Sequence, residues 1–182
     1  MRAVIVRHGN TFAPGEPPRR IGARTDLALV ESGRAQARAL QAHFAGVRFD
    51  RCLCSPLLRT RETAAIIAPY LEAEPAEWLR EIDHGPDEGR YEEDVTARIG
   101  GEALAAWESD AIAPAGWIVD APPRIAAWQD LLSADITTLL VTSNGAARFA
   151  RIALGLSPAK LRTGAYGDIR DGKIAAWDIR PA

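Results

Sequence analysis

The sequence predicts an α/β domain with a mostly parallel central sheet, and three observations support this prediction. Residues 3–6 (Ala-Val-Ile-Val) and 138–142 (Thr-Leu-Leu-Val-Thr) are apolar and rich in β-branched side chains, as strands buried on both faces are. Segments with helical periodicity alternate with such runs, which is typical of βαβ units. The 182 residues, 47% hydrophobic and 25% charged, suit one ordinary globular domain. We therefore expect a single domain over residues 1–182.

The first half of the chain contains clear signals for helices and breaks. Ala37, Leu40 and Phe44 recur at the spacing of one helix face. Proline and glycine mark the breaks between elements. These signals predict, in order, a loop at 14–22, a helix from about Ser32 that ends before Gly46, a strand at 51–54, and a helix from Leu58 that Pro69 ends or kinks.

The second half is predicted from the same signals, together with an Asp-Gly dipeptide that is typical of a hairpin turn. Gly100 and Gly101 weaken the first of its helices. The expected order is a helix over 92–109, a loop at 113–123, a helix at 123–132, a strand at 138–142, a helix at 146–154, a strand near 165–169, a turn at 171–172 and a strand at 173–179.

Composition excludes several classes of protein. The net charge of −2 and the lack of a long basic run argue against a nucleic-acid-binding surface. No run approaches the roughly 20 apolar residues of a membrane helix, and Arg7 ends the first apolar run too early for a secretory leader. Cys52 and Cys54 are too close in sequence for a disulfide and are expected to be buried free thiols. A cytoplasmic location is the resulting expectation.

Polar residues follow three of the predicted strands directly. They are Arg7-His8, Ser55-Pro56 and Ser143-Asn144-Gly145. Ligands of open α/β sheets bind beyond the carboxyl ends of the strands. We therefore expect these three strand ends to converge on one site.

The segment 7–11 combines residue types that suit phosphoryl chemistry. Arg7 offers a forked guanidinium that fits phosphate oxygens. An imidazole such as that of His8 can attack phosphorus and divide one displacement into two steps. Gly9 permits close approach of the backbone to a ligand, and Asn10 and Thr11 add short polar side chains.

This segment, Arg-His-Gly-Asn-Thr, resembles the RHGxT signature of the histidine phosphatase superfamily, which includes the cofactor-dependent phosphoglycerate mutases. Three further blocks resemble that family in order and spacing: GARTDLALVESGRAQA at 22–37, SPLLRTRETA at 55–64 and LREIDHGPDEG at 79–89. The resemblance is dense in the first half of the chain and thin in the second. It implies a phosphoglycerate mutase-like fold, a three-layer α/β/α sandwich.

The resemblance also implies roles for individual residues. His8 is the expected nucleophile, and Arg7 and Arg59 are the expected clamp on the phosphoryl oxygens, where positive charge accelerates phosphoryl transfer. Glu81 matches the general acid, a task that usually requires a raised pKa. Glu88 and Asp83 are held in reserve for that role. A metal site from Asp83, His84 and Asp87 lacks recognisable ligand spacing, so no metal and no cofactor is expected.

The chain departs from the family pattern at Asn144, where relatives carry a second histidine. An asparagine amide still donates a hydrogen bond but brings no positive charge. Loss of one preorganised donor costs roughly 10²–10³ in rate, so slow catalysis is permitted. Ser143 or Asn144 could instead cap the following helix. Ser143 lacks the frame of a hydrolase nucleophile.

The expected function is hydrolysis of a small phosphorylated metabolite through phospho-His8, with Glu81 as proton donor. Mutase activity is disfavoured because no long insertion is present. The alternative is a catalytically impaired protein that only binds a phosphorylated ligand. No nucleic-acid or membrane partner is expected, and the oligomeric state stays open. The expected substrate-binding residues are Asn10, Thr11, Arg24, Asn144 and Gly145, whereas Arg19 and Arg20 are assigned to the surface and Trp117 to a pocket mouth.

Overall fold

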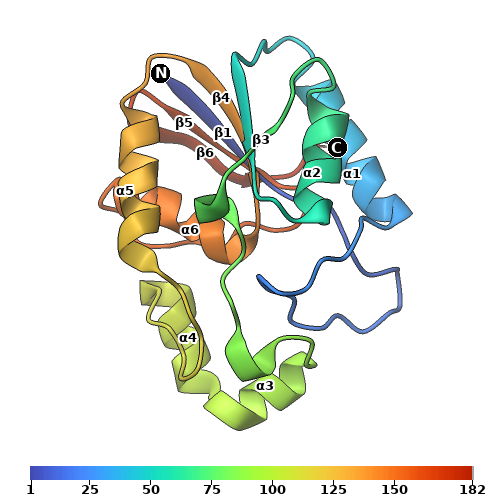
Figure 1. Cartoon of the computed structure of the whole chain (residues 1–182), viewed down its shortest axis with the longest axis vertical. Coiled ribbons are helices and arrows are strands. Elements are labelled where there is room, and N and C mark those ends of the chain that lie inside the picture. The colour runs from blue at the N-terminus through green and yellow to red at the C-terminus, as the bar shows by residue number, and fades with distance from the viewer. Residues whose placement is uncertain (182) are drawn as a thin grey trace.

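The computed structural model describes residues 1–181 and is built around one six-stranded sheet (Figure 1). The strands follow the spatial order β3-β2-β4-β1-β5-β6. The four strands from β3 to β1 run parallel, and β5 pairs antiparallel with both β1 and β6. The mostly parallel sheet predicted from the sequence is therefore confirmed. The strands are β1 (Arg2–Arg7), β2 (Arg51–Cys54), β3 (Glu74–Pro75), β4 (Thr137–Thr142), β5 (Tyr166–Arg170) and β6 (Lys173–Ile179).

The two apolar runs of the sequence form the centre of the sheet. Strands β1 and β4 pair in register from Arg2 with Thr137 to Arg7 with Thr142. Their interior side chains are fully buried because helices cover both faces. At the far edge, Asp171 and Gly172 take positive φ values of 47° and 72° between β5 and β6. Two such residues suit the tight turn of a two-residue hairpin.

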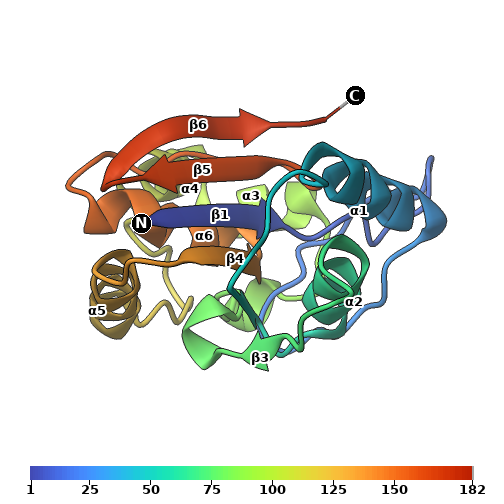
Figure 2. The same ribbon diagram turned by 90° about the horizontal axis from the view of Figure 1, so that it is seen from above.

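Helices cover both faces of the sheet and make three layers (Figure 2). Helices α1 (Glu31–His43) and α2 (Leu58–Ile67) pack on one face, where Val4 and Val6 point. Helices α5 (Ala121–Leu132) and α6 (Asn144–Ala153) pack on the other, against Ala3 and Ile5. Alternate residues of one strand thus serve two separate cores. The predicted three-layer sandwich is confirmed.

Helices α3 (Glu92–Ile99) and α4 (Gly101–Asp110) lie below the sheet in Figure 1, at the end toward which β1 points. The sequence predicted one helix over 92–109. Two form instead, because Gly100 adopts φ 82°, which is outside the helical region. Short 3₁₀ turns at Glu77–Leu79 (η1) and Gly85–Asp87 (η2) were not predicted, and neither was the two-residue strand β3.

Two further expectations concern buried thiols and membranes. Cys52 and Cys54 are buried on β2 and carry free thiols, as predicted. Burial raises the pKa of Cys52 to about 12.

Over residues 1–181, no helix has the length and apolar character needed to cross a bilayer.

Candidate active site

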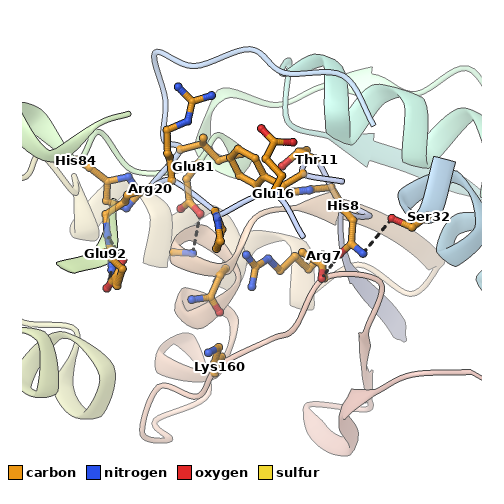
Figure 3. Close-up of a pocket in the computed structure, with 18 of the residues that line it drawn as sticks. Arg7, His8, Thr11, Glu16, Arg20, Ser32, Glu81, His84, Glu92 and Lys160 are labelled. Carbon is orange, nitrogen blue, oxygen red and sulfur yellow. Dashed lines mark hydrogen bonds and ion pairs between the residues drawn. The ribbon is translucent and has the colours of Figure 1, made fainter. Parts of the chain in front are cut away.

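The ends of β1 and β4 open into a cavity of about 790 Å³. Arg7 closes β1 and pairs with Thr142, the last residue of β4, so the residues after both strands begin side by side. Figure 3 shows the side chains that line the cavity. Of the predicted site residues, the lining includes Arg7, His8, Asn10, Thr11, Glu81, Asn144 and Gly145.

His8 is held in one tautomer by its own backbone. Its Nδ1 lies 2.8 Å from the carbonyl oxygen of Gly9, which can only accept, so Nδ1 carries the proton. The lone pair of the neutral ring is therefore on Nε2. Burial lowers the pKa of His8 well below its usual value, and the charges of Arg59 and Arg7 lower it further. The imidazole is neutral at pH 7, which is the nucleophilic form.

The loop that carries His8 is fixed against helix α1 by two glycines. A Cβ on Gly9 would lie 2.3 Å from the carbonyl oxygen of Gly33, and one on Gly33 would lie 2.2 Å from that of Asn10. Gln36, one turn further along α1, accepts a hydrogen bond from the Asn10 backbone at 2.9 Å. The glycine and glutamine of the 22–37 block thus position the loop rather than contact a ligand.

Two arginines act on His8, the half-buried Arg7 and the buried Arg59. Arg7 donates from one terminal nitrogen to the carbonyl of Leu161 at 2.9 Å. Arg59 is fully buried on α2, does not line the cavity, and donates to the carbonyls of Thr25 and Gly22. In both residues Nε is buried and has no hydrogen-bond partner within residues 1–181. Buried donors of this kind are costly unless something accepts from them.

Glu81 is held at the cavity wall by backbone donors. Its Oε1 accepts from the Ile82 nitrogen at 2.9 Å, and its Oε2 accepts from the Gly145 nitrogen at 3.1 Å. Thr142 donates to the carbonyl of Leu79 at 2.6 Å, and Arg124 of α5 donates to that of Arg80 at 2.6 Å. The segment before Glu81 is therefore attached to both β4 and α5.

The pKa of Glu81 is below its ordinary value, which differs from the raised pKa that the sequence led us to expect. Burial raises the pKa of this carboxyl. The charge of His84, the two backbone donors and the charge of Arg7 outweigh burial and lower it. Glu81 is thus ionised at pH 7 in the free protein, and a bound phosphate dianion would raise its pKa by repulsion.

Asn144 is the first residue of α6, and its side chain is already engaged. Its Oδ1 accepts the backbone N–H of Leu161 at 2.9 Å, which leaves the amide Nδ2 as donor. Ser143 occupies the N-cap position but makes no side-chain capping bond, and its hydroxyl has no partner in the described part of the chain. Neither side chain caps the helix, so that interpretation is wrong.

Some residues lie elsewhere than expected. Arg24 is more than half exposed, pairs with Asp83 and Glu88, and is not among the cavity-lining residues. Arg19 and Arg20, assigned to the surface, both line the cavity, although Arg19 is exposed as expected. Trp117 is a core residue against His84 and Trp107, and Trp107 takes the lining position. Lining residues that sequence reasoning missed include Phe12, Glu16, Ser32, Glu92, Glu108, Lys160 and Thr163.

No group of three or more His, Cys, Asp or Glu residues is suitably placed for a metal ion within residues 1–181.

Comparison with known proteins settles the family. Residues 3–168 match the model of the histidine phosphatase superfamily (branch 1). The chain belongs to this superfamily. A probable 2-carboxy-D-arabinitol-1-phosphatase of Arabidopsis thaliana is 31% identical over 166 residues, which are 85% of this chain and 33% of that protein. An adenosylcobalamin/alpha-ribazole phosphatase of Salmonella typhimurium is 34% identical over 60% of this chain and 54% of its own.

The chain thus spans between about a third and about half of the curated relatives that it matches. A mycobacterial glucosyl-3-phosphoglycerate phosphatase structure superposes with a TM-score of 0.83, covers 98% of this chain and 99% of its own, and is 22% identical. That likeness concerns the fold, which is the phosphoglycerate mutase-like sandwich predicted above.

Proposed function

We propose that this member of the superfamily is a phosphomonoester hydrolase that acts through a phosphohistidine at His8. The observation that carries the proposal is the state of His8: a neutral imidazole at the cavity wall, with Nδ1 donating to Gly9 and the lone pair on Nε2. Family membership and the phosphatase relatives support the same reaction class. A small phosphorylated metabolite as substrate and a cytoplasmic location are parts of this proposal.

The first chemical step transfers the phosphoryl group to the protein. Nε2 of His8 attacks phosphorus, and the bond from phosphorus to the alcohol oxygen breaks with its electron pair on that oxygen. Glu81, protonated once the phosphate dianion is bound, gives its proton to the leaving alcohol. Arg7, which lines the cavity and has a buried Nε donor without a partner in the described chain, balances the charge on the phosphoryl oxygens. Arg59 does not line the cavity and adds positive charge at longer range, as its effect on the pKa of His8 indicates.

The second step returns the protein to its starting state. Water attacks the phosphohistidine, Glu81 accepts a proton from that water, and the P–N bond breaks with its electron pair on Nε2. The proton that Glu81 lost is thereby regained, and inorganic phosphate leaves. No redox partner or metal takes part in this balance.

In this proposal, Asn144 supplies a neutral donor at the position where the resemblance to the family implies an imidazole. Its Oδ1 is fixed by Leu161, so Nδ2 has a defined direction. In Asn144→His, Nδ1 of the new ring is the same number of bonds from Cα as Oδ1 and can accept the same N–H. Nε2–H would then extend toward the cavity. We expect this variant to be faster than the parent chain.

The test is hydrolysis of an aryl phosphate in the presence of a chelator, with the parent chain compared with His8→Ala. We expect turnover in the parent and none above background in His8→Ala. His43→Ala is the matched control, because His43 lies on α1 against Tyr166 and does not line the cavity. Folded parent protein that binds phosphate without turnover would favour the ligand-binding alternative. Activity retained in His8→Ala would refute the phosphohistidine.

A further inference from the structure

Lys160 lines the cavity, and the reaction above gives it no task. In Figure 3 it lies below Arg7, on the side of the view away from Thr11 and Glu16. Several glutamates line the same cavity, yet the ammonium group of Lys160 forms no ion pair and no hydrogen bond within residues 1–181. A cavity-lining cation that no carboxylate neutralises attracts an anionic ligand.

The backbone next to Lys160 is held by two residues of the candidate active site. Asn144 accepts the N–H of Leu161 at 2.9 Å, and Arg7 donates to the carbonyl of Leu161, also at 2.9 Å. The carbonyl of Lys160 accepts from Nε1 of Trp177 at 3.0 Å. The peptide that joins Lys160 to Leu161 is therefore fixed at its N–H by Asn144 and at its oxygen by β6. Asn144, the residue that lacks a positive charge, thus places a lysine at the cavity.

The remainder of the segment 157–162 is fixed as well. Arg151 of α6 donates to the carbonyl of Ser157 at 2.8 Å. At the other end, the backbone N–H of Arg162 donates to Asp178 at 2.7 Å, and the two side chains form an ion pair at 2.6 Å. A backbone held in this way loses little conformational freedom when a ligand binds, so only the lysine stem has to be ordered.

The other cavity-lining cations outside β1 already have partners. Arg20 forms an ion pair with the start of α3. The guanidinium of Arg19 lies over the ring of Phe12, 5.9 Å from its centroid. Arg7 and Lys160 are then the lining cations that have neither a carboxylate nor an aromatic partner in the described chain. Both are attached to the backbone of Leu161, one by a hydrogen bond and the other by a peptide bond.

We propose that the ammonium group of Lys160 binds the phosphoryl oxygens and supplies the positive charge that an asparagine at position 144 does not bring. The proposal rests on the proposed function, because it concerns the same phosphoryl transfer. Cations on the phosphoryl oxygens stabilise the charge of that transition state. An ammonium group has three donors on a flexible stem, so it can follow the oxygens as phosphorus moves from the alcohol to His8. Lys160 keeps all its protons, and the balance of the reaction is unchanged.

The first test needs no turnover. The chain has two lysines, Lys160 and Lys173, and Lys173 begins β6 and does not line the cavity. Acetylation of both side chains is followed by mass spectrometry with and without inorganic phosphate, so that Lys173 is the control in the same sample. We expect phosphate to slow the acetylation of Lys160 several-fold and to leave that of Lys173 unchanged. An unchanged rate at Lys160 would overturn the proposal, whether or not the protein is an enzyme.

The second test is hydrolysis of an uncharged aryl alcohol's phosphate by Lys160→Gln and Lys160→Arg, with Lys173→Gln as the matched control. Loss of a preorganised donor costs roughly 10²–10³ in rate. Lys160 is exposed, so solvent screens its charge, and we expect kcat to fall by about tenfold in Lys160→Gln. Lys160→Arg keeps the charge and should lose less.

Two outcomes of this assay would overturn the proposal. Equal losses in Lys160→Gln and Lys160→Arg would mean that the charge is not what matters. An unchanged kcat, with a raised KM only for substrates that carry a carboxylate on their alcohol, would mean that Lys160 recognises the leaving group instead of the phosphoryl group.

A double-mutant cycle tests the link to position 144. If Lys160 supplies the missing charge, Lys160→Gln should cost less in an Asn144→His background than in the parent chain. Additive effects would refute this compensation. Absence of turnover that depends on His8 would refute the proposed function, and protection of Lys160 by phosphate would still decide whether this lysine binds the anion.

Discussion

Gly145→Ala tests whether Glu81, the proposed general acid, depends on a glycine at the start of α6. A Cβ at this position would lie 2.2 Å from Oε1 and 3.1 Å from Cδ of Glu81. The Glu81 carboxylate would have to move by about 1 Å to restore an ordinary contact with this Cβ, because non-bonded atoms repel inside roughly 3.4 Å. The carboxylate cannot make this shift and keep both backbone hydrogen bonds, from Ile82 and Gly145.

The expected loss in Gly145→Ala follows from that displacement. A misplacement of about 1 Å in an active site costs on the order of 10²-fold in rate, so we expect kcat to fall by about that factor. The free energy of unfolding should hardly change, since alanine favours a helix by about 1 kcal/mol over glycine and offsets part of the crowding.

The assay is aryl phosphate hydrolysis at saturating substrate, with urea unfolding of the same preparations. Gly46→Ala is the matched control, because a Cβ there meets nothing within 4 Å. A kcat within about threefold of the parent would refute the reasoning, because it would mean that Glu81 functions away from the position described here.

Two further predictions concern stability. In Gly9→Ala the new Cβ would lie 2.3 Å from the carbonyl oxygen of Gly33. The free energy of unfolding, measured in urea, should therefore be about 1–3 kcal/mol lower than in the parent. An unchanged urea midpoint would contradict this contact. Burial raises the pKa of Asp168, but Arg2 and Arg170 outweigh it and hold that pKa below its usual value. Its stabilisation is therefore complete above the unfolded-state pKa and is lost as pH falls through the folded-state value. Asp168→Asn should lose about 1–3 kcal/mol at pH 7 and much less near pH 2, and equal losses at both would exclude this ion pair as the cause.

Local sequence was sufficient to find the part of the cavity that is formed by continuous segments. Arg7 and His8 follow a strand whose apolar run is unmistakable, and Glu81 falls in a block with its own glycines. Five of the six strands, and helices α1, α2, α5 and α6, were predicted from such local signals, whereas β3 and the division of α3 from α4 were not. Gly100 was recognised as a weak point, but its positive φ, which divides α3 from α4, depends on how the chain returns to the sheet.

The far wall of the cavity could not be predicted, because its residues come from segments distant in sequence. Glu92 and Glu108 are provided by α3 and α4, and Lys160 by the segment after α6. Arg24 illustrates the converse: it lies inside a matched block, yet its side chain turns toward Asp83 and away from the cavity. A residue's place in a block that resembles the family therefore predicted where its backbone lies. The direction of its side chain depended on residues that are distant in sequence.

The segments that line the cavity differ in how much change of sequence and length they tolerate. His8, Asn144 and Glu81 are attached to strand ends and to α6, so any insertion beside them would disturb the sheet. Another part of the lining comes from residues 11–21, which belong to no helix or strand. Loops of this kind accept changes of length and sequence at little cost in stability. Under the proposed function, changes in that segment alone would alter which alcohol the cavity accepts, while His8, Asn144 and Glu81 stay as they are.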